Sequence, residues 1–101
     1  MATKKKHAPI HPGEVLKHDF LEPLGITAYR LAKDTGISAQ HVGRIVHGKR
    51  GIGAETALRM ARYFGTSAEM WMNLQARYEL DTAEDELGRQ IEKDVKPYEA
   101  A

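Results

Sequence analysis

The sequence contains no cysteine, which excludes a disulfide framework, a thiol nucleophile and a zinc site built on thiolates. Its uninterrupted apolar runs are only a few residues long, so we expect neither a transmembrane helix nor the hydrophobic segment of a secretion signal. No stretch alternates apolar and polar residues over the length of a strand. These absences lead us to expect an all-α protein that is soluble and cytoplasmic.

The 101 residues are enough for one small domain and too few for two, and 42% hydrophobic residues allow a modest core. The formal net charge of +1 conceals an uneven distribution. Residues 1–66 contain eleven Lys and Arg against five Asp and Glu, whereas residues 67–101 contain four against nine. A basic first part favours a polyanionic partner, and an acidic second part favours a different role.

Apolar residues recur at helical spacing in five segments that capping and turn residues separate. The first predicted helix starts at Pro12 and ends at Pro23 and Gly25. Four more are predicted over residues 28–35, 38–46, about 54–64, and from 68 to about 80. A charged segment restarts at residues 81–82, and it forms either a sixth packed helix or a frayed one.

Residues 28–46 have the pattern of a helix-turn-helix. Gly36 supplies the backbone angle that a short turn between two helices requires, and Ser38 is a suitable N-cap for the second helix. Val42 and Ile45 give that helix its inward apolar side. Its outward side carries short or polar side chains suited to base edges in a major groove. We predict that these contact bases: Ala39, Gln40, His41, Gly43 and Arg44.

Other polar residues near this motif are predicted to contact DNA phosphates, which fix the register of the protein but do not read the sequence. They are Thr27, Tyr29, Arg30, Ser38, Lys49 and Arg50. Because one recognition helix touches too few bases for operator-level affinity, we expect a homodimer on a palindromic double-stranded operator. Apolar residues in the last two segments are candidates for the dimer or partner interface, although core positions are the alternative: Trp71, Leu74, Tyr78, Leu87 and Ile91.

These patterns divide the chain into three predicted parts. Residues 1–8 form a flexible basic tail, which either touches phosphates or remains solvated. Residues 9–81 form the helix-turn-helix DNA-binding domain, and residues 82–101 form an acidic C-terminal helix or tail.

The sequence contains no convincing pattern for catalysis or metal binding. Residues 43–49 match the start of a phosphate-binding loop, but Arg50 stands where Ser or Thr would hold magnesium. His7 and His11 are four residues apart, but this pair precedes Pro12 and has no acidic ligand nearby at the right spacing, and His18, His41 and His47 are scattered. We therefore predict no enzyme activity, no metal and no cofactor. A nuclease that uses the scattered histidines and acidic residues is the weakest alternative.

Five sequence blocks occur in order: HPGEVL from His11, YRLAK from Tyr29, GKRGI from Gly48, TALRMARYFG from Thr56 and WMNLQ from Trp71. Together they resemble the HigA-type antitoxins, also called the virulence-associated protein I family, over roughly residues 9–80. The resemblance implies a phage-repressor-like helix-turn-helix fold and a dimeric DNA-binding antitoxin. It also implies that the protein represses its own operon and neutralises a small basic HigB-type ribonuclease toxin. A stand-alone repressor without a toxin partner remains the alternative.

Overall fold

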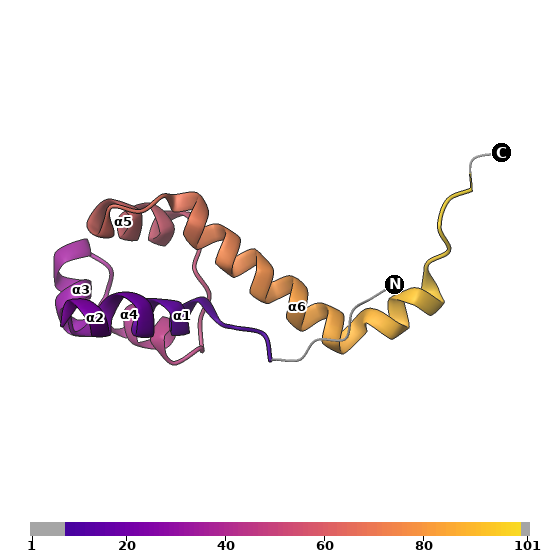
Figure 1. The fold of residues 1–101 in the computed structure, drawn as a ribbon, viewed down its shortest axis with the longest axis horizontal. Coiled ribbons are helices and arrows are strands. Elements are labelled where there is room, and N and C mark those ends of the chain that lie inside the picture. Colours follow the sequence, from indigo (N-terminus) through magenta and orange to yellow (C-terminus); the bar gives the residue numbers. More distant parts are fainter. Residues whose placement is uncertain (1–7, 100–101) are drawn as a thin grey trace.

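The computed structural model describes residues 8–99, which form five helices and no strand (Figure 1). The first is a continuous helix made of α1 (Pro12–Val15), the π-helical segment η1 (Leu16–Leu21) and α2 (Glu22–Leu24). The others are α3 (Ala28–Thr35), α4 (Ala39–Val46), α5 (Ala54–Phe64) and α6 (Ala68–Asp94). The all-α prediction is therefore confirmed for these residues, while all of the predicted tail except Ala8 lies outside them. None of the described helices is both long enough and apolar enough to cross a membrane.

The first helix begins at Pro12 and ends one residue after Pro23, directly before Gly25, as predicted. A proline inside an α-helix lacks a donor, and its ring clashes with the carbonyl four residues earlier. The π-helical segment provides the physical reason that Pro23 is tolerated, because the Glu22 N–H there donates to the Lys17 carbonyl five residues back. Gly25, with a φ of 65°, ends the helix.

The side chain of Trp71 lies fully buried at the centre of the core. Its ring lies 5.0 Å from that of Phe20 and 6.1 Å from that of Phe64, measured between centroids. The indole Nε1 donates a hydrogen bond of 2.9 Å to Thr66 Oγ1, so burial leaves no donor unpaired. Other fully buried side chains come from the first helix, α3, α4 and α5: Leu16, Leu31, Val42, Ile45 and Met60. Placing Trp71 at an intermolecular interface was therefore wrong.

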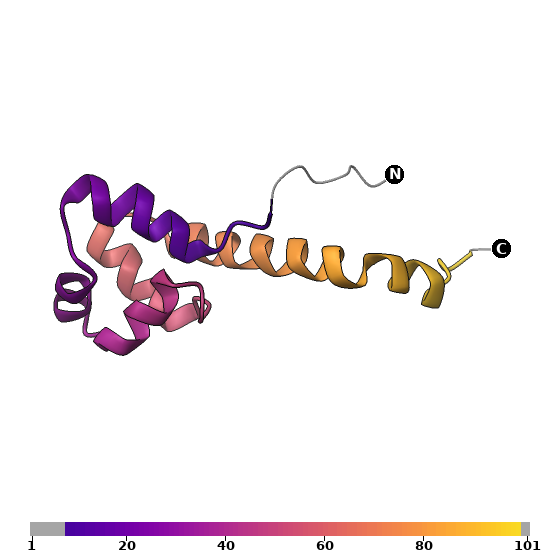
Figure 2. The same cartoon turned by 90° about the horizontal axis from the view of Figure 1, so that it is seen from below.

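Helix α6 is a single helix of 27 residues, and the break expected at residues 81–82 does not occur. Asp and Thr inside a helix cost about 0.7 kcal/mol or less each relative to Ala, and residues 68–87 contain neither Gly nor Pro. The first half of α6 packs against α5 and the first helix, and the second half extends away from the other helices (Figures 1 and 2). The proposed boundary between residues 81 and 82 stays a prediction.

The first helix and α4 are in backbone contact at Gly13. A Cβ atom added there would lie 1.9 Å from the Ile45 carbonyl oxygen. His11 fixes this start of the helix, because its Nδ1 accepts a 2.9 Å hydrogen bond from the Gly13 N–H. Only glycine therefore allows the first helix to approach α4 this closely.

Replacing Gly13 with Ala should destabilise the protein by about 1–3 kcal/mol, because one of the two backbones must move. The matched control is Gly88→Ala in α6, where an added Cβ would meet Glu84 Cγ at 3.5 Å, an ordinary contact. That change should be neutral or stabilise the helix by up to about 1 kcal/mol. Urea unfolding followed by circular dichroism measures both, and equal midpoints for the two variants would contradict the close contact.

Candidate nucleic-acid interface

Helices α3 and α4 form a helix-turn-helix whose capping residues are those that the sequence predicts. Thr27 Oγ1 accepts a 3.0 Å hydrogen bond from the Arg30 N–H at the start of α3. Ser38 Oγ accepts a 3.0 Å hydrogen bond from the His41 N–H at the start of α4. Gly36 lies between them with a φ of 78°, in the left-handed region that favours glycine. The turn therefore fixes α4 relative to α3 by local backbone chemistry.

The outward side of α4 presents the residues predicted to contact bases. Ala39, Gln40 and Arg44 are exposed, and His41 and Gly43 are half-buried. A Cβ added at Gly43 would meet nothing within 4 Å, so the surface there is open. The inward side carries the buried Val42 and Ile45, as the periodicity indicated. The structure thus brings the predicted set together on one exposed helix face.

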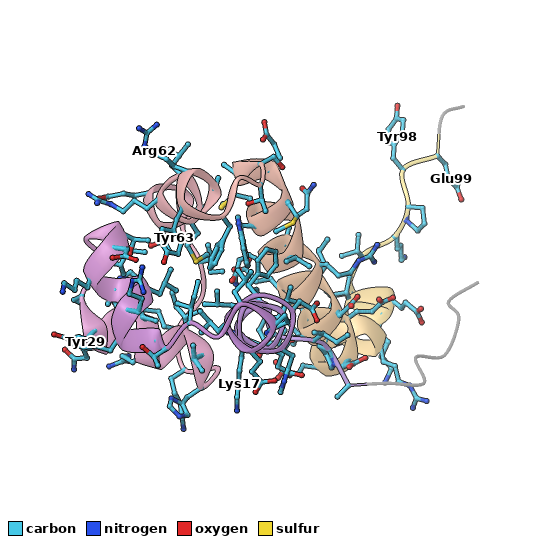
Figure 3. All side chains as sticks on the ribbon, turned by 60° about the vertical axis from the view of Figure 1, so that its left-hand side comes forward. Lys17, Tyr29, Arg62, Tyr63, Tyr98 and Glu99 are labelled. Carbon is cyan, nitrogen blue, oxygen red and sulfur yellow. The ribbon has the colours of Figure 1, made fainter. Side chains whose placement is uncertain are left out.

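The residues predicted to contact phosphates are all exposed, but some of their polar groups already have partners within the protein. The hydroxyls of Thr27 and Ser38 cap helices, and Arg30 Nε donates to Asp34 Oδ2 at 2.6 Å. Tyr29 is 71% exposed and lies at the outer surface of α3 (Figure 3). The full set of residues predicted to contact phosphates is Thr27, Tyr29, Arg30, Ser38, Lys49 and Arg50.

Three cations of α4 and the loop after it form no ion pair within residues 8–99: Arg44, Lys49 and Arg50. The stretch from residue 35 to residue 54 contains no Asp or Glu at all. Exposed cations without ion pairs beside an open helix face are the electrostatic pattern expected of a surface that binds a polyanion.

The pKa of His41 is lowered from its ordinary value of 6.5, first by burial and then by the nearby charges of Arg50 and Arg44. Glu55 opposes this shift. His41 is therefore mainly neutral at pH 7, with one ring nitrogen able to donate and the other able to accept.

Helix α5 holds the end of α3 that leads into the turn. Arg59 Nη1 donates to the Thr35 carbonyl at 2.8 Å, and Tyr63 OH donates to Asp34 Oδ2 at 2.7 Å. The hydrogen bond from Tyr63 and then that from Arg30 hold the pKa of the Asp34 carboxyl below its ordinary value. Sequence reasoning did not identify these contacts. The spacing of four between Arg30 and Asp34 was a usable signal for their ion pair, but nothing local points to a partner on α5.

The predicted interface residues of α6 have three different environments. Trp71 is in the core, and Leu74 and Tyr78 are half-buried, with the Tyr78 ring against the His11 ring at 4.8 Å between centroids. Leu87 and Ile91 are each 50% exposed on the extending half of the helix. Leu80, which the sequence prediction omitted, is 67% exposed on the same side, since spacings of seven and four keep residues on one helix face.

The two helices, their turn and the open face of α4 define a helix-turn-helix protein, and the family profile described as "Helix-turn-helix" matches residues 18–71. Virulence-associated protein I of Dichelobacter nodosus is 45% identical over 85 residues, which cover 84% of this chain and 79% of that protein. The chain belongs to the HigA antitoxin family, so the resemblance seen in the sequence is confirmed.

Two further comparisons extend this assignment. A solved structure described as Pseudomonas aeruginosa antitoxin HigA with the higBA promoter is 47% identical, with a TM-score of 0.88, and the match covers 90% of this chain and 99% of that one. An uncharacterised helix-turn-helix-type transcriptional regulator of Escherichia coli K12, YbaQ, is 33% identical over 91 residues, which cover 90% of this chain and 78% of that protein.

Replacing Asp34 with Asn should lower the stability of the protein at neutral pH. It should also reduce the loss of stability that occurs as the pH is lowered. Because folding lowers the pKa of Asp34, its contribution is present above the ordinary value of 3.8 and is lost as the pH falls through the folded value. Urea midpoints at pH 7 and at several values below 4 measure this difference between variant and unmodified protein. Asp19→Asn, at an exposed position of the first helix, is the control. A midpoint difference that stays constant with pH would contradict the assigned role of the Asp34 carboxylate.

Proposed function

We propose that this chain is a DNA-binding antitoxin that represses its own operon and neutralises the toxin encoded beside it. The observation that carries the proposal is the open face of α4 beside three cations without ion pairs, in a chain 47% identical to a HigA antitoxin solved with promoter DNA. The proposed activity is binding rather than catalysis, and its place is the cytoplasm, where the operator DNA is found.

In the proposed complex, α4 lies in the major groove of the operator. Arg44 donates to guanine and Gln40 pairs with adenine, and each good pair contributes about 1–3 kcal/mol of discrimination. The open surface at Gly43 allows the helix to approach the groove closely, with Ala39 and His41 beside it. Lys49 and Arg50 contact phosphates, together with Thr27, Tyr29, Arg30 and Ser38 at the starts of α3 and α4.

A second copy of the chain supplies the other half of the proposed complex. Leu80, Leu87 and Ile91 form an exposed apolar face on α6, which we name the α6 stripe. Pairing of two such stripes would remove these side chains from water and place two recognition helices on one DNA duplex. A two-fold dimer then requires half-sites about 34 Å apart.

The proposed toxin is a small basic HigB-type ribonuclease. The acidic C-terminal part of the chain, with four Lys and Arg against nine Asp and Glu over residues 67–101, suits a basic partner. A stand-alone repressor without toxin is the second candidate, and the likeness to YbaQ favours it. Co-expression with the protein encoded next to the gene separates them, because only an antitoxin restores growth and co-purifies with that protein.

Gel shifts with the DNA upstream of the gene test the proposed docking. Arg44→Ala should lower specific affinity by about 1–3 kcal/mol and relax discrimination at one base pair of each half-site. Lys49→Ala should weaken binding to all sequences alike and reduce the slope of log affinity against log salt by about one. Unchanged affinity and equal salt slopes in both variants would exclude this docking of α4.

The dimer has its own test. Leu87→Glu should shift the protein toward monomer in sedimentation at micromolar concentration, because a charge would replace an apolar contact between the two stripes. Leu24→Glu, at a position 59% exposed on α2, is the matched control and should leave the mass unchanged. If both variants sediment as the unmodified protein does, the α6 stripe is not the dimer interface.

A further inference from the structure

A shallow depression lies between α4 and α5. His41 lines it from α4, Arg50 from the loop that follows, and Glu55 and Arg59 from α5. We propose that this depression binds one phosphate of the DNA backbone, with Arg50 and Arg59 as the charged donors and His41 as the third. The proposal rests on the proposed function and adds to it a site on α5, whose residues the sequence analysis did not assign to DNA.

The donors of this depression are only partly used within the protein. Arg50 forms no ion pair within residues 8–99. Arg59 is held by the Thr35 carbonyl at 2.8 Å from Nη1, and by Glu55 Oε2 at 3.1 Å from Nε and 3.0 Å from Nη2. A guanidinium has five N–H donors, so Arg59 keeps donors for a further acceptor while its position stays fixed.

Glu55 is the group that a phosphate would have to tolerate. Its side chain is 79% exposed, so its ion pair with Arg59 is largely screened by water and contributes little. A phosphate diester carries one negative charge and would meet this carboxylate as well as the two arginines. Removal of the Glu55 charge should therefore strengthen phosphate binding.

His41 supports the same assignment. It lies half-buried in the depression, where Arg44 of its own helix, Arg50 of the loop, and Glu55 and Arg59 of α5 face it. A bound phosphate would oppose the two arginines that lower its pKa, so binding and protonation of His41 should favour each other. In this proposal His41 faces a phosphate at the edge of the groove, whereas the sequence predicts that it contacts a base.

The experiment measures binding of the full chain to the upstream duplex, and to a scrambled duplex of equal length, by fluorescence anisotropy at several salt concentrations. Arg50→Ala and Arg59→Ala should each lower affinity for both duplexes about tenfold and reduce the salt slope by about one. Glu55→Gln should raise affinity about two- to fivefold. Arg62→Ala, at an exposed position of the same helix that points away from the body of the protein, is the matched control and should change nothing (Figure 3).

Arg59→Ala also removes a contact to α3, so Glu55→Gln provides the second test. An unchanged salt slope in both arginine variants, or no gain with Glu55→Gln, would overturn the proposal. If Arg44→Ala relaxes discrimination while the depression variants bind normally, the phosphate site fails and the proposed function stands. If the upstream duplex binds no more tightly than the scrambled duplex, the proposed function fails.

Inorganic phosphate distinguishes the source of the ligand. A titration with phosphate alone, followed by the NMR shifts of the His41 ring in the unmodified protein and in Arg50→Ala, tests the depression independently of DNA. We expect weak binding that Arg50→Ala abolishes, and tighter binding to both duplexes as the pH is lowered through the pKa of His41. Phosphate binding without any effect of the variants on duplex affinity would overturn the assignment to the DNA backbone.

Discussion

The close approach of α4 to the first helix depends on one backbone contact, that between Gly13 and the Ile45 carbonyl. A helix that reads DNA must present its outer face at a fixed angle and depth, because base contacts tolerate errors of only a fraction of an ångström. The loop after α4 is held as well, since the Ile52 N–H donates to the buried Gln75 Oε1 of α6 at 2.8 Å. The inner side of α4 and the loop after it are therefore fixed by elements that themselves carry no DNA-binding residue.

Helix α5 adds a second constraint, at the end of α3 that precedes the turn. Arg59 and Tyr63 hold the C-terminal end of α3, and the carbonyl that Arg59 caps belongs to Thr35, directly before the turn glycine. The last carbonyl groups of a helix have no donor within the helix and usually accept hydrogen bonds from water or from a glycine cap. A donor from another helix therefore restrains the end of α3 further. It also brings the charge of Arg59 next to the start of α4.

Local chemistry made most of the fold predictable from the sequence. Thr27, Ser38 and the glycines with positive φ act on their immediate neighbours, so the limits of α3, α4 and α5 follow from a few residues each. The expected break at residues 81–82 does not occur, because the modest helix propensities of Asp81 and Thr82 do not end a helix by themselves. The sequence left Trp71 between core and interface, because its ring partners Phe20 and Phe64 lie on other helices. The contacts of Arg59 and Tyr63 were beyond sequence reasoning, because their partners lie on α3.

The charges of the chain show why α4 is the surface that needs a partner. On other helices, cations pair with acids four residues away, as Arg30 does with Asp34 and Arg59 with Glu55. Arg44 cannot do so, because Gln40 and Gly48 occupy the positions four residues before and after it. Neighbouring exposed cations repel over about 8 Å at physiological salt. Residues 35–54 contain no Asp or Glu, and the acids on either side of this stretch, Asp34 and Glu55, are already paired with Arg30 and Arg59. A polyanion would relieve this repulsion, so the local charge of the free protein favours binding to DNA before any base is read.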